Sequence, residues 1–309
     1  MIFALFSKLT SMMLFVVVGF VLVRLRLLKV EDSQPLSTLL VYVMQPCLII
    51  NAFQIEITPE RLHNYLAAVI FSTSVYVLWI IVASVARKAL HLSPVTEDTL
   101  IYSNVGNLVL PLVAMVLGDE MVFYASAAQI PFNIFFWTHG SIVIQDSRQI
   151  NWKKIVLNPN LIAVFIGLFL LVTKIRIPDI PMTTITGFSN AVASVSMLMV
   201  GIVIAKSDLL DLIRYKKTYV VLFGRLIIFP LIAIAALYVS GLARRFSEYL
   251  PALMTVFIGL CAPPASSVSQ LAILYDKTPE EATRLNVMGM FFCIVTIPLM
   301  VGIFQTIFM

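Results

Sequence analysis

The sequence predicts an all-α integral membrane protein, with ten transmembrane helices arranged as two inverted five-helix repeats. Three observations predict this fold: an unusually apolar composition, apolar runs separated by short polar segments, and a proline-interrupted run at a matching place in each half. Of the 309 residues, 60% are hydrophobic and 12% are charged, whereas a typical soluble domain carries about 25% charged residues. With a mean hydropathy of +0.99, the sequence indicates no separate soluble domain.

The apolar runs have the length that a bilayer requires, which is about 20 residues for a helix. We expect spans at 3–23, 36–53, 65–86, 98–117, 122–145, 160–174, 183–205, 218–241, 250–274 and 283–308. The first run is interpreted as a span because cations, and not the small residues of a signal cleavage site, follow it. The predicted domains are therefore a first repeat at 1–145, a short cytoplasmic linker at 146–159 and a second repeat at 160–309.

The distribution of cations predicts the orientation. Fourteen Lys and Arg residues lie in the loops that follow odd-numbered spans, and six lie on the side of the two termini. Because cytoplasmic loops are enriched in Lys and Arg, we expect both termini to be extracytoplasmic in a plasma (inner) membrane. The net charge of +5 sits at span ends, so it indicates topology and a lipid bilayer as partner, and no nucleic acid.

The two halves of the chain repeat each other. Pro111 interrupts the fourth span and Pro263 the ninth, 152 residues later (263 − 111), and a polar turn follows each. Five spans per repeat is an odd number, so the second repeat must be inverted in the membrane. Inverted repeats with an interrupted helix at the same place in each half are typical of secondary transporters with a midplane site. The sequence therefore predicts a transporter.

The interruptions are expected at 104–111 and 261–267. Proline removes one backbone amide and excludes the hydrogen bond to the carbonyl four residues back, and Gly106 adds backbone freedom in the fourth span. Broken backbone survives in a membrane only against protein or a water-filled cavity. Ordinary proline kinks are the alternative interpretation, since proline is more frequent in membrane helices than in soluble ones.

The half-helices beginning near these prolines would direct their positive ends at the break, which favours an anionic substrate. The candidate substrate-binding residues are Asn104, Gly106, Asn107, Pro111, Gln129, Asn133, Cys261, Pro263, Pro264, Ser266 and Ser267. Arg225 is the one basic residue well inside a run. It is a candidate counter-charge for the substrate, or it snorkels to the headgroups, and both interpretations stay open.

The positions of the acidic residues, cysteines and histidines disfavour cation antiport, disulfide bonds, metal binding and catalysis. All 16 acidic residues are expected in loops or at span ends, which disfavours an antiporter that carries its cation on an intramembrane carboxylate. The three cysteines lie in apolar runs and predict neither a disulfide nor a metal site. The three histidines are far apart in sequence, and no HExxH or GxSxG pattern occurs. We therefore expect no cofactor, no metal and no enzymatic activity.

Several motifs resemble the auxin efflux carrier family, whose plant branch is the PIN-FORMED carriers. The fourth span reads SNVGNLVLPL at 103–112, similar to the family's small residue, Asn-Thr-Gly and Pro-Leu, with Val105 in place of Thr. The fifth span reads NIFFWTHG at 133–140, and APPA stands at 262–265 in the ninth. The similarity extends over essentially the whole chain.

The resemblance implies a scaffold of spans 1, 2, 6 and 7 that forms a homodimer, and a transport part of spans 3–5 and 8–10. It also implies that the interrupted fourth and ninth helices cross, that an elevator-type movement exposes the crossing alternately, and that the substrate is a carboxylate. Ser266 and Ser267 stand where the plant carriers offer an asparagine, and the linker is short, as in a bacterial or archaeal-type member. A sodium- or proton-coupled bile-acid or antiporter-type carrier is the alternative, and the coupling ion stays open.

Overall fold

The computed structural model describes residues 2–145, 152–205, 214–245 and 247–309. These residues fold as helices joined by short loops, and the only β-type pairing among them is one isolated antiparallel bridge between Ser103 and Pro264. The predicted all-helical class is therefore confirmed. Residues 146–151 of the predicted linker, including Arg148, and the cation Lys206 lie outside the described residues.

The helices follow the predicted spans closely. In the first half they are α1 (Ile2–Arg24), η1 (Val30–Asp32), α2 (Ser33–Leu39), η2 (Leu40–Met44), α3 (Gln45–Ala52), α4 (Pro59–Leu90), α5 (Pro94–Ile101), η3 (Val105–Val109), α6 (Leu110–Leu117), α7 (Asp119–Ser126), α8 (Gln129–Phe135), η4 (Phe136–Gly140) and α9 (Ser141–Gln145). In the second half they are α10 (Trp152–Val156), α11 (Pro159–Val172), α12 (Asp179–Ile204), α14 (Lys216–Phe223), η5 (Gly224–Ile228), α15 (Phe229–Val239), α16 (Leu242–Arg245), η6 (Ser247–Tyr249), α17 (Leu250–Leu260), α18 (Ser266–Leu274) and α19 (Pro279–Phe308).

Six helices of the described chain are long and apolar enough to cross a membrane. They are Ile2–Arg24, Val30–Ala52, Pro59–Leu90, Asp179–Ile204, Lys216–Val239 and Pro279–Phe308. Shorter apolar helices at Val105–Leu117, Pro159–Val172 and Ser247–Leu260 fall within the fourth, sixth and ninth expected spans. The multi-pass membrane character is thus confirmed, and the count of ten stays a prediction.

Capping residues and prolines mark the start of two helices of the first half. Thr58 accepts a hydrogen bond from the Arg61 amide at the start of α4, and Ser93 accepts one from the Thr96 amide at the start of α5. A proline follows each of these capping residues. Such caps satisfy amides that lack an intrahelical partner, and proline fits the first helical turn because it has no amide to satisfy.

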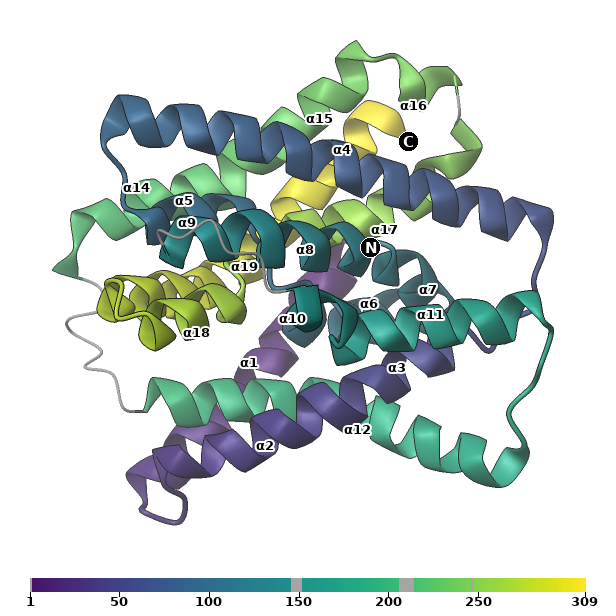
Figure 1. The fold of residues 1–309 in the computed structure, drawn as a ribbon, viewed down its shortest axis with the longest axis horizontal. Coiled ribbons are helices and arrows are strands. Elements are labelled where there is room, and N and C mark those ends of the chain that lie inside the picture. The colour runs from purple at the N-terminus through teal and green to yellow at the C-terminus, as the bar shows by residue number, and fades with distance from the viewer. Residues whose placement is uncertain (1, 146–151, 206–213, 246) are drawn as a thin grey trace.

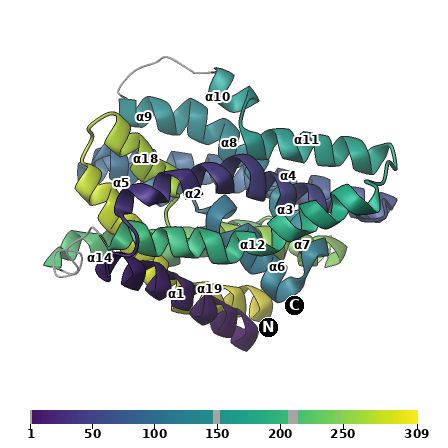
Figure 2. The ribbon, with the colours of Figure 1, turned by 90° about the horizontal axis from the view of Figure 1, so that it is seen from below.

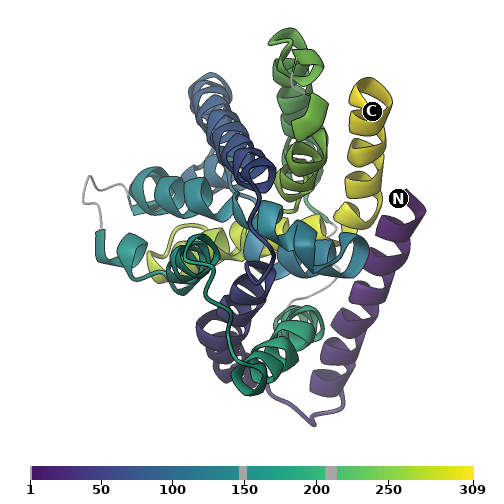
Figure 3. The same cartoon turned by 90° about the vertical axis from the view of Figure 1, so that its right-hand side faces the viewer.

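One group of helices, α1, α3, α11 and α12, packs together. Figure 1 shows α2, α3 and α12 along the lower side of the molecule, and in Figure 3 the purple helix α1 runs lengthwise at the right-hand edge. Helices α1 and α12 approach until their backbones touch: a Cβ atom added at Gly19 would lie 2.1 Å from the carbonyl oxygen of Leu198. Close crossing at small residues is the usual way in which membrane helices pack.

Helix α4 lies on the opposite, upper side of Figure 1, near α14 and α15. It packs on α5 and α17, and α19 packs on α14 and α17. Figure 2 shows the two chain ends near each other, and a Cβ atom added at Gly302 would lie 3.0 Å from Ile2. The interrupted segments of the fourth and ninth spans lie between the upper and lower groups.

Candidate functional site

The two interruptions lie directly against each other. The backbone amide of Asn104 donates to the carbonyl of Pro263 at 2.9 Å, and the amide of Ala265 donates to the carbonyl of Tyr102 at 2.9 Å. Backbone groups that the breaks remove from their helices therefore satisfy one another. Because unpaired backbone groups are costly away from water, this short antiparallel pairing lets both chains stay non-helical inside the protein.

The first interruption begins earlier than its proline predicts. Helix α5 ends at Ile101, the chain is non-helical at 102–104, and helical backbone resumes as the π-helical turn Val105–Val109. Pro111 lies within the first turn of α6, and the amide before it, that of Leu110, bonds to the carbonyl of Val105. The wider π turn absorbs the missing proline amide. The irregular backbone therefore extends over 102–109, two residues earlier than the expected 104–111.

The second interruption matches the prediction. Helix α17 ends at Leu260 and α18 begins at Ser266, so Pro263 and Pro264 lie in the non-helical segment. Asn286 of α19 donates to the carbonyl of Pro264 at 2.8 Å. Gly289, one turn further along α19, leaves room for the ring of Pro264, since a Cβ atom at Gly289 would lie 2.6 Å from the Cδ atom of Pro264. Helix α19 thus packs against the second break and satisfies one of its backbone carbonyls.

A polar cavity of about 150 Å³ opens where the two breaks meet. Six predicted site residues line it: Asn104, Gly106, Asn107, Gln129, Asn133 and Ser267. Polar lining residues that the prediction missed are Ser37, Gln45, Ser103, Asn158, Asn160 and Gln270. The lining residues carry no formal charge, and the N-terminal turns of η3 and α18 both open onto the cavity.

Side-chain amides from four helices converge on Gly106. The Gln45 side chain donates to the Oδ1 atom of Asn107 and accepts from Asn160 at 2.8 Å. A Cβ atom added at Gly106 would lie 3.2 Å from Nε2 of Gln129, 3.5 Å from Gln45 and 3.6 Å from Asn160. Gly106 is therefore required for close approach, and not for the backbone freedom that the sequence suggested, because its φ angle is not positive.

Two of these amides each keep one atom without a partner among the described residues: the Nε2 donor of Gln129 and the Oδ1 acceptor of Asn160. The Gln129 side chain is 1% exposed. Asn133 donates to the Gln129 backbone carbonyl at 2.8 Å and lies 3.4 Å from its Oε1 atom. Buried amides of this kind normally find a partner. The Gln129 nitrogen therefore has a donor to offer to an occupant of the cavity.

The other predicted residues frame the cavity without lining it. Ser266 accepts a hydrogen bond from the Asn104 side chain at 3.2 Å, which ties the two breaks together a second time. Cys261 is fully buried at the end of α17. Pro111, Pro263 and Pro264 are likewise outside the cavity lining.

Arg225 is fully buried and bonds to backbone carbonyls. Its Nη1 atom donates to Leu100 at 3.2 Å, and its Nη2 atom donates to Leu260 at 3.1 Å and to Ala262 at 3.0 Å. The guanidinium also stacks on Trp79, with Cζ 4.8 Å from the ring centroid. The positive charge therefore sits at the C-terminal ends of α5 and α17, where free carbonyls favour cations. With no exposed surface, the side chain does not snorkel.

A larger cavity of about 540 Å³ adjoins the polar one and shares Ser37, Val41, Trp137, Asn158 and Gln270 with it. We call it the vestibule. Of the described charged residues, two cations, Lys153 and Lys154, line it. The Lys154 ammonium lies 4.9 Å from the centroid of the Trp137 ring. Positive charge therefore lies in the cavity next to the polar one.

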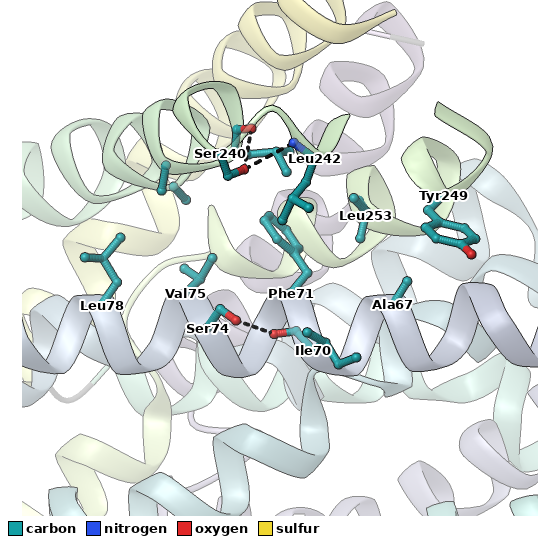
Figure 4. Close-up of a pocket in the computed structure, with 13 residues that line it drawn as sticks. Ala67, Ile70, Phe71, Ser74, Val75, Leu78, Ser240, Leu242, Tyr249 and Leu253 are labelled. Carbon is teal, nitrogen blue, oxygen red and sulfur yellow. Dashed lines mark hydrogen bonds between the residues drawn. The ribbon is translucent and has the colours of Figure 1, made fainter. Parts of the chain in front are cut away.

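A third cavity, of about 420 Å³, lies between α4 and the segment α15–α17, as Figure 4 shows. Its wall is apolar except for Tyr249 and two serines. Ser74 and Ser240 both donate to carbonyls of their own helices, at 2.8 Å and 2.9 Å. Because these hydroxyls are already engaged, the groove offers little to a charged solute and resembles a surface for lipid chains.

Two carboxylates at the start of the fourth span are buried within the protein. Glu97 and Asp98 of α5 are 2% and 0% exposed. Glu97 accepts from Ser84 at 2.6 Å and pairs with Arg87 at 2.8 Å. Within the described ranges no three His, Cys, Asp or Glu side chains are grouped to hold a metal ion.

Comparison with known families gives one match. The model of the family described as membrane transport protein matches the chain twice, over residues 4–151 and 143–301. Together the two stretches include nearly the whole chain, and both interruptions lie within them. No curated protein sequence matches the chain.

Proposed function

The chain belongs to the membrane transport protein family, the family of the auxin efflux carriers, and from this premise we propose that it is a secondary transporter of small organic anions. The substrate class is carboxylates, including auxin-like acids, and the site is the polar cavity between the two interruptions. The observation that carries this proposal is the convergence of uncharged amides and two helix N-termini on one cavity.

Several features support an anion. Helix N-termini carry partial positive charge and amides that point outward, so they bind carboxylates without a buried counter-ion. The unpaired Nε2 atom of Gln129 offers a further donor. Lys153 and Lys154 would concentrate anions in the vestibule, because a cleft lined by one sign of charge raises the local concentration of the opposite ion.

The arrangement of the helices also supports an elevator-type movement. The proposed scaffold of spans 1, 2, 6 and 7 contributes Gln45 and Asn160 to the cavity, whereas the proposed transport part contributes Asn104, Asn107 and Gln129. The cavity thus lies at the boundary between the two parts. Sliding one part along the other would break the Gln45 bond to Asn107, which crosses the boundary, and keep the Gln45 bond to Asn160 within the scaffold. The movement would carry the breaks, with their bound anion, across the membrane.

Further parts of this proposal rest on the family resemblance and the charge distribution. We propose ten spans in two inverted repeats, at 1–145 and 160–309, with the interrupted fourth and ninth helices crossing. We also propose a homodimer through the scaffold, both termini extracytoplasmic, and a plasma-membrane location. Under that orientation the vestibule, which contains Lys153 and Lys154 of the linker, faces the cytoplasm.

The proposal is tested with purified protein in liposomes, by uptake of labelled monocarboxylates, dicarboxylates and an indole acid. We expect saturable uptake of at least one of them, and an uptake at least about tenfold lower in N104A, because a hydrogen bond to a charged group contributes about 1.5–3 kcal/mol. S74A, in the apolar groove, is the matched control and should transport normally. Saturable uptake that N104A leaves unchanged would overturn the site.

A further inference from the structure

The buried carboxyl of Asp98 has no partner. Its side chain is fully buried, and neither carboxyl oxygen accepts or donates a hydrogen bond among the described residues. The carboxyl faces the fifth span, since a Cβ atom added at Gly140 would lie 3.0 Å from Oδ2 of Asp98. An isolated carboxylate in an apolar interior is very unfavourable, and such a group neutralises itself by taking up a proton.

Among the described residues, no cation pairs with the Asp98 carboxyl instead. Arg87, on the neighbouring α4, is already paired with Glu97. Arg225 of η5 is bound to backbone carbonyls. On α19 and α14, Glu281 pairs with Lys217 at 3.4 Å, and Arg284 bonds to Thr218 at 3.0 Å. The remaining titratable groups nearby are Tyr76 on α4, Tyr102 after α5 and His139 on η4, whereas the described residues of α9 and α18 contain none.

Two titratable side chains, Glu97 and His139, lie near Asp98, and one of them is partly exposed. Glu97 is the sequence neighbour of Asp98, and the Oε1 atom of Glu97 lies 3.9 Å from the Nε2 atom of His139. The His139 side chain is 24% exposed and that of Arg87 is 36% exposed. The 3.9 Å separation between Glu97 and His139 exceeds a hydrogen bond, so a proton that passes along these groups needs a bridging water or a small movement of the side chains.

The same cluster is joined to the first interruption. The hydroxyl of Tyr102 lies 3.0 Å from the Nδ1 atom of His139 and donates to the carbonyl of Phe135 at 2.9 Å. The backbone carbonyl of Tyr102 accepts from Ala265 in the second break. A change in the charge of this cluster would therefore act on the residue that holds the two breaks together.

We propose that Asp98 is the proton-binding residue of this transporter, that it exchanges its proton with water through Glu97 and His139, and that its occupancy is coupled to the movement of the breaks. In the conformation described here Asp98 carries the proton. Loss of the proton leaves a charge that must be hydrated, and hydration requires α5 to separate from η4. The coupling rests on the proposed transport function, whereas the protonated state of Asp98 does not.

Infrared spectroscopy of the full chain in lipid bilayers tests the protonated state without any substrate. At neutral pH we expect the carbonyl stretch of a protonated carboxyl, which is lost in D98N and retained in E281Q, the matched control. A missing band in the wild type, a band that persists in folded D98N, or a band that sodium chloride removes would each overturn the proposal. The last result would assign the carboxylate to sodium.

A second variant addresses the route and does not depend on D98N folding. E97Q should keep the Asp98 band but exchange its proton for deuterium at least about tenfold more slowly than the wild type, since proton transfer through a positioned group contributes about 10²–10⁴-fold. Exchange as fast as in the wild type would overturn the route. In liposomes that transport a carboxylate, D98N should abolish the accompanying proton flux, and an unchanged flux would overturn the coupling.

Discussion

Gly106 and Gln129 approach so closely that a methyl group added at Gly106 would lie 3.2 Å from the Nε2 atom of Gln129. The glycine therefore leaves the space in which the amides of three other helices meet, and the donor of Gln129 points into that space. In the fifth span, Gln129 has nothing in its neighbouring sequence that would reveal this contact. Both residues line the proposed substrate cavity.

We predict that G106A weakens transport while leaving the fold intact. Overpacking of a well-packed site costs about 1–3 kcal/mol, which corresponds to a substrate affinity roughly fivefold to a hundredfold lower. The measurement is substrate concentration dependence in liposomes, with thermal unfolding in parallel. G259A is the matched control, because its Cβ atom would make only an ordinary contact of 3.6 Å with Val109. Equal affinity in G106A and the wild type would place the substrate elsewhere.

Substitution of Arg225 should destabilise the protein more than it changes substrate recognition. R225M leaves three carbonyls without a donor, and each buried group left unsatisfied costs about 1–3 kcal/mol. We therefore expect a free energy of unfolding lower by about 3 kcal/mol or more, measured by thermal or denaturant unfolding in detergent. The control is R24A, because Arg24 is an exposed arginine at the end of α1 that stacks on Phe20.

The variant R225K distinguishes a structural role of Arg225, in which it binds three backbone carbonyls, from a role in substrate recognition. A lysine keeps the charge but does not reproduce the planar fork that reaches three carbonyls, so R225K should also be less stable than the wild type. If Arg225 is instead the counter-charge of the substrate, R225K will unfold normally and lose affinity.

The sequence predicts the helices well because membrane spans depend on local composition. Each expected span coincides with helical structure in the described chain, and the second break lies where Pro263 and Pro264 indicate. Pro111 was less informative, since a proline signals a missing amide but not how the backbone adapts. The π turn beginning at Val105 accommodates that missing amide, and no local pattern predicts it.

The cavity could be predicted only in part. Asn104, Gly106 and Asn107 belong to one motif, whereas Gln45 and Asn160 are isolated amides in other spans that only the fold brings together. Asp98 was missed for a different reason. A hydropathy boundary placed it at the end of the fourth span, but α5 begins at Pro94 and the surrounding helices bury its first turns.

We predict that removing the vestibule charges slows anion uptake in a salt-dependent manner. The double variant K153Q/K154Q should reduce the initial rate at low ionic strength by about tenfold, the lower end of electrostatic steering, and the difference should shrink at high salt because salt screens exposed charges. The control is K277Q, an exposed lysine on the same expected side and outside the vestibule. An effect equal at low and high salt would show that the lysines act by packing.

The contact between spans 1 and 7 provides a test of the proposed scaffold. A Cβ atom at Gly201 would lie 2.0 Å from the backbone carbonyl oxygen of Val16, and backbone atoms of a helix cannot turn aside as a side chain does. G201A should therefore force α1 and α12 apart and lower the free energy of unfolding by about 2 kcal/mol or more. G187A lies on the same helix with no atom within 4 Å of its Cβ and should be neutral or slightly stabilising, because alanine favours helix over glycine. Thermal unfolding of both variants measures the difference. Equal stability of G201A and G187A would show that α1 and α12 are not held together at this crossing. That result would contradict the proposed scaffold contact between spans 1 and 7.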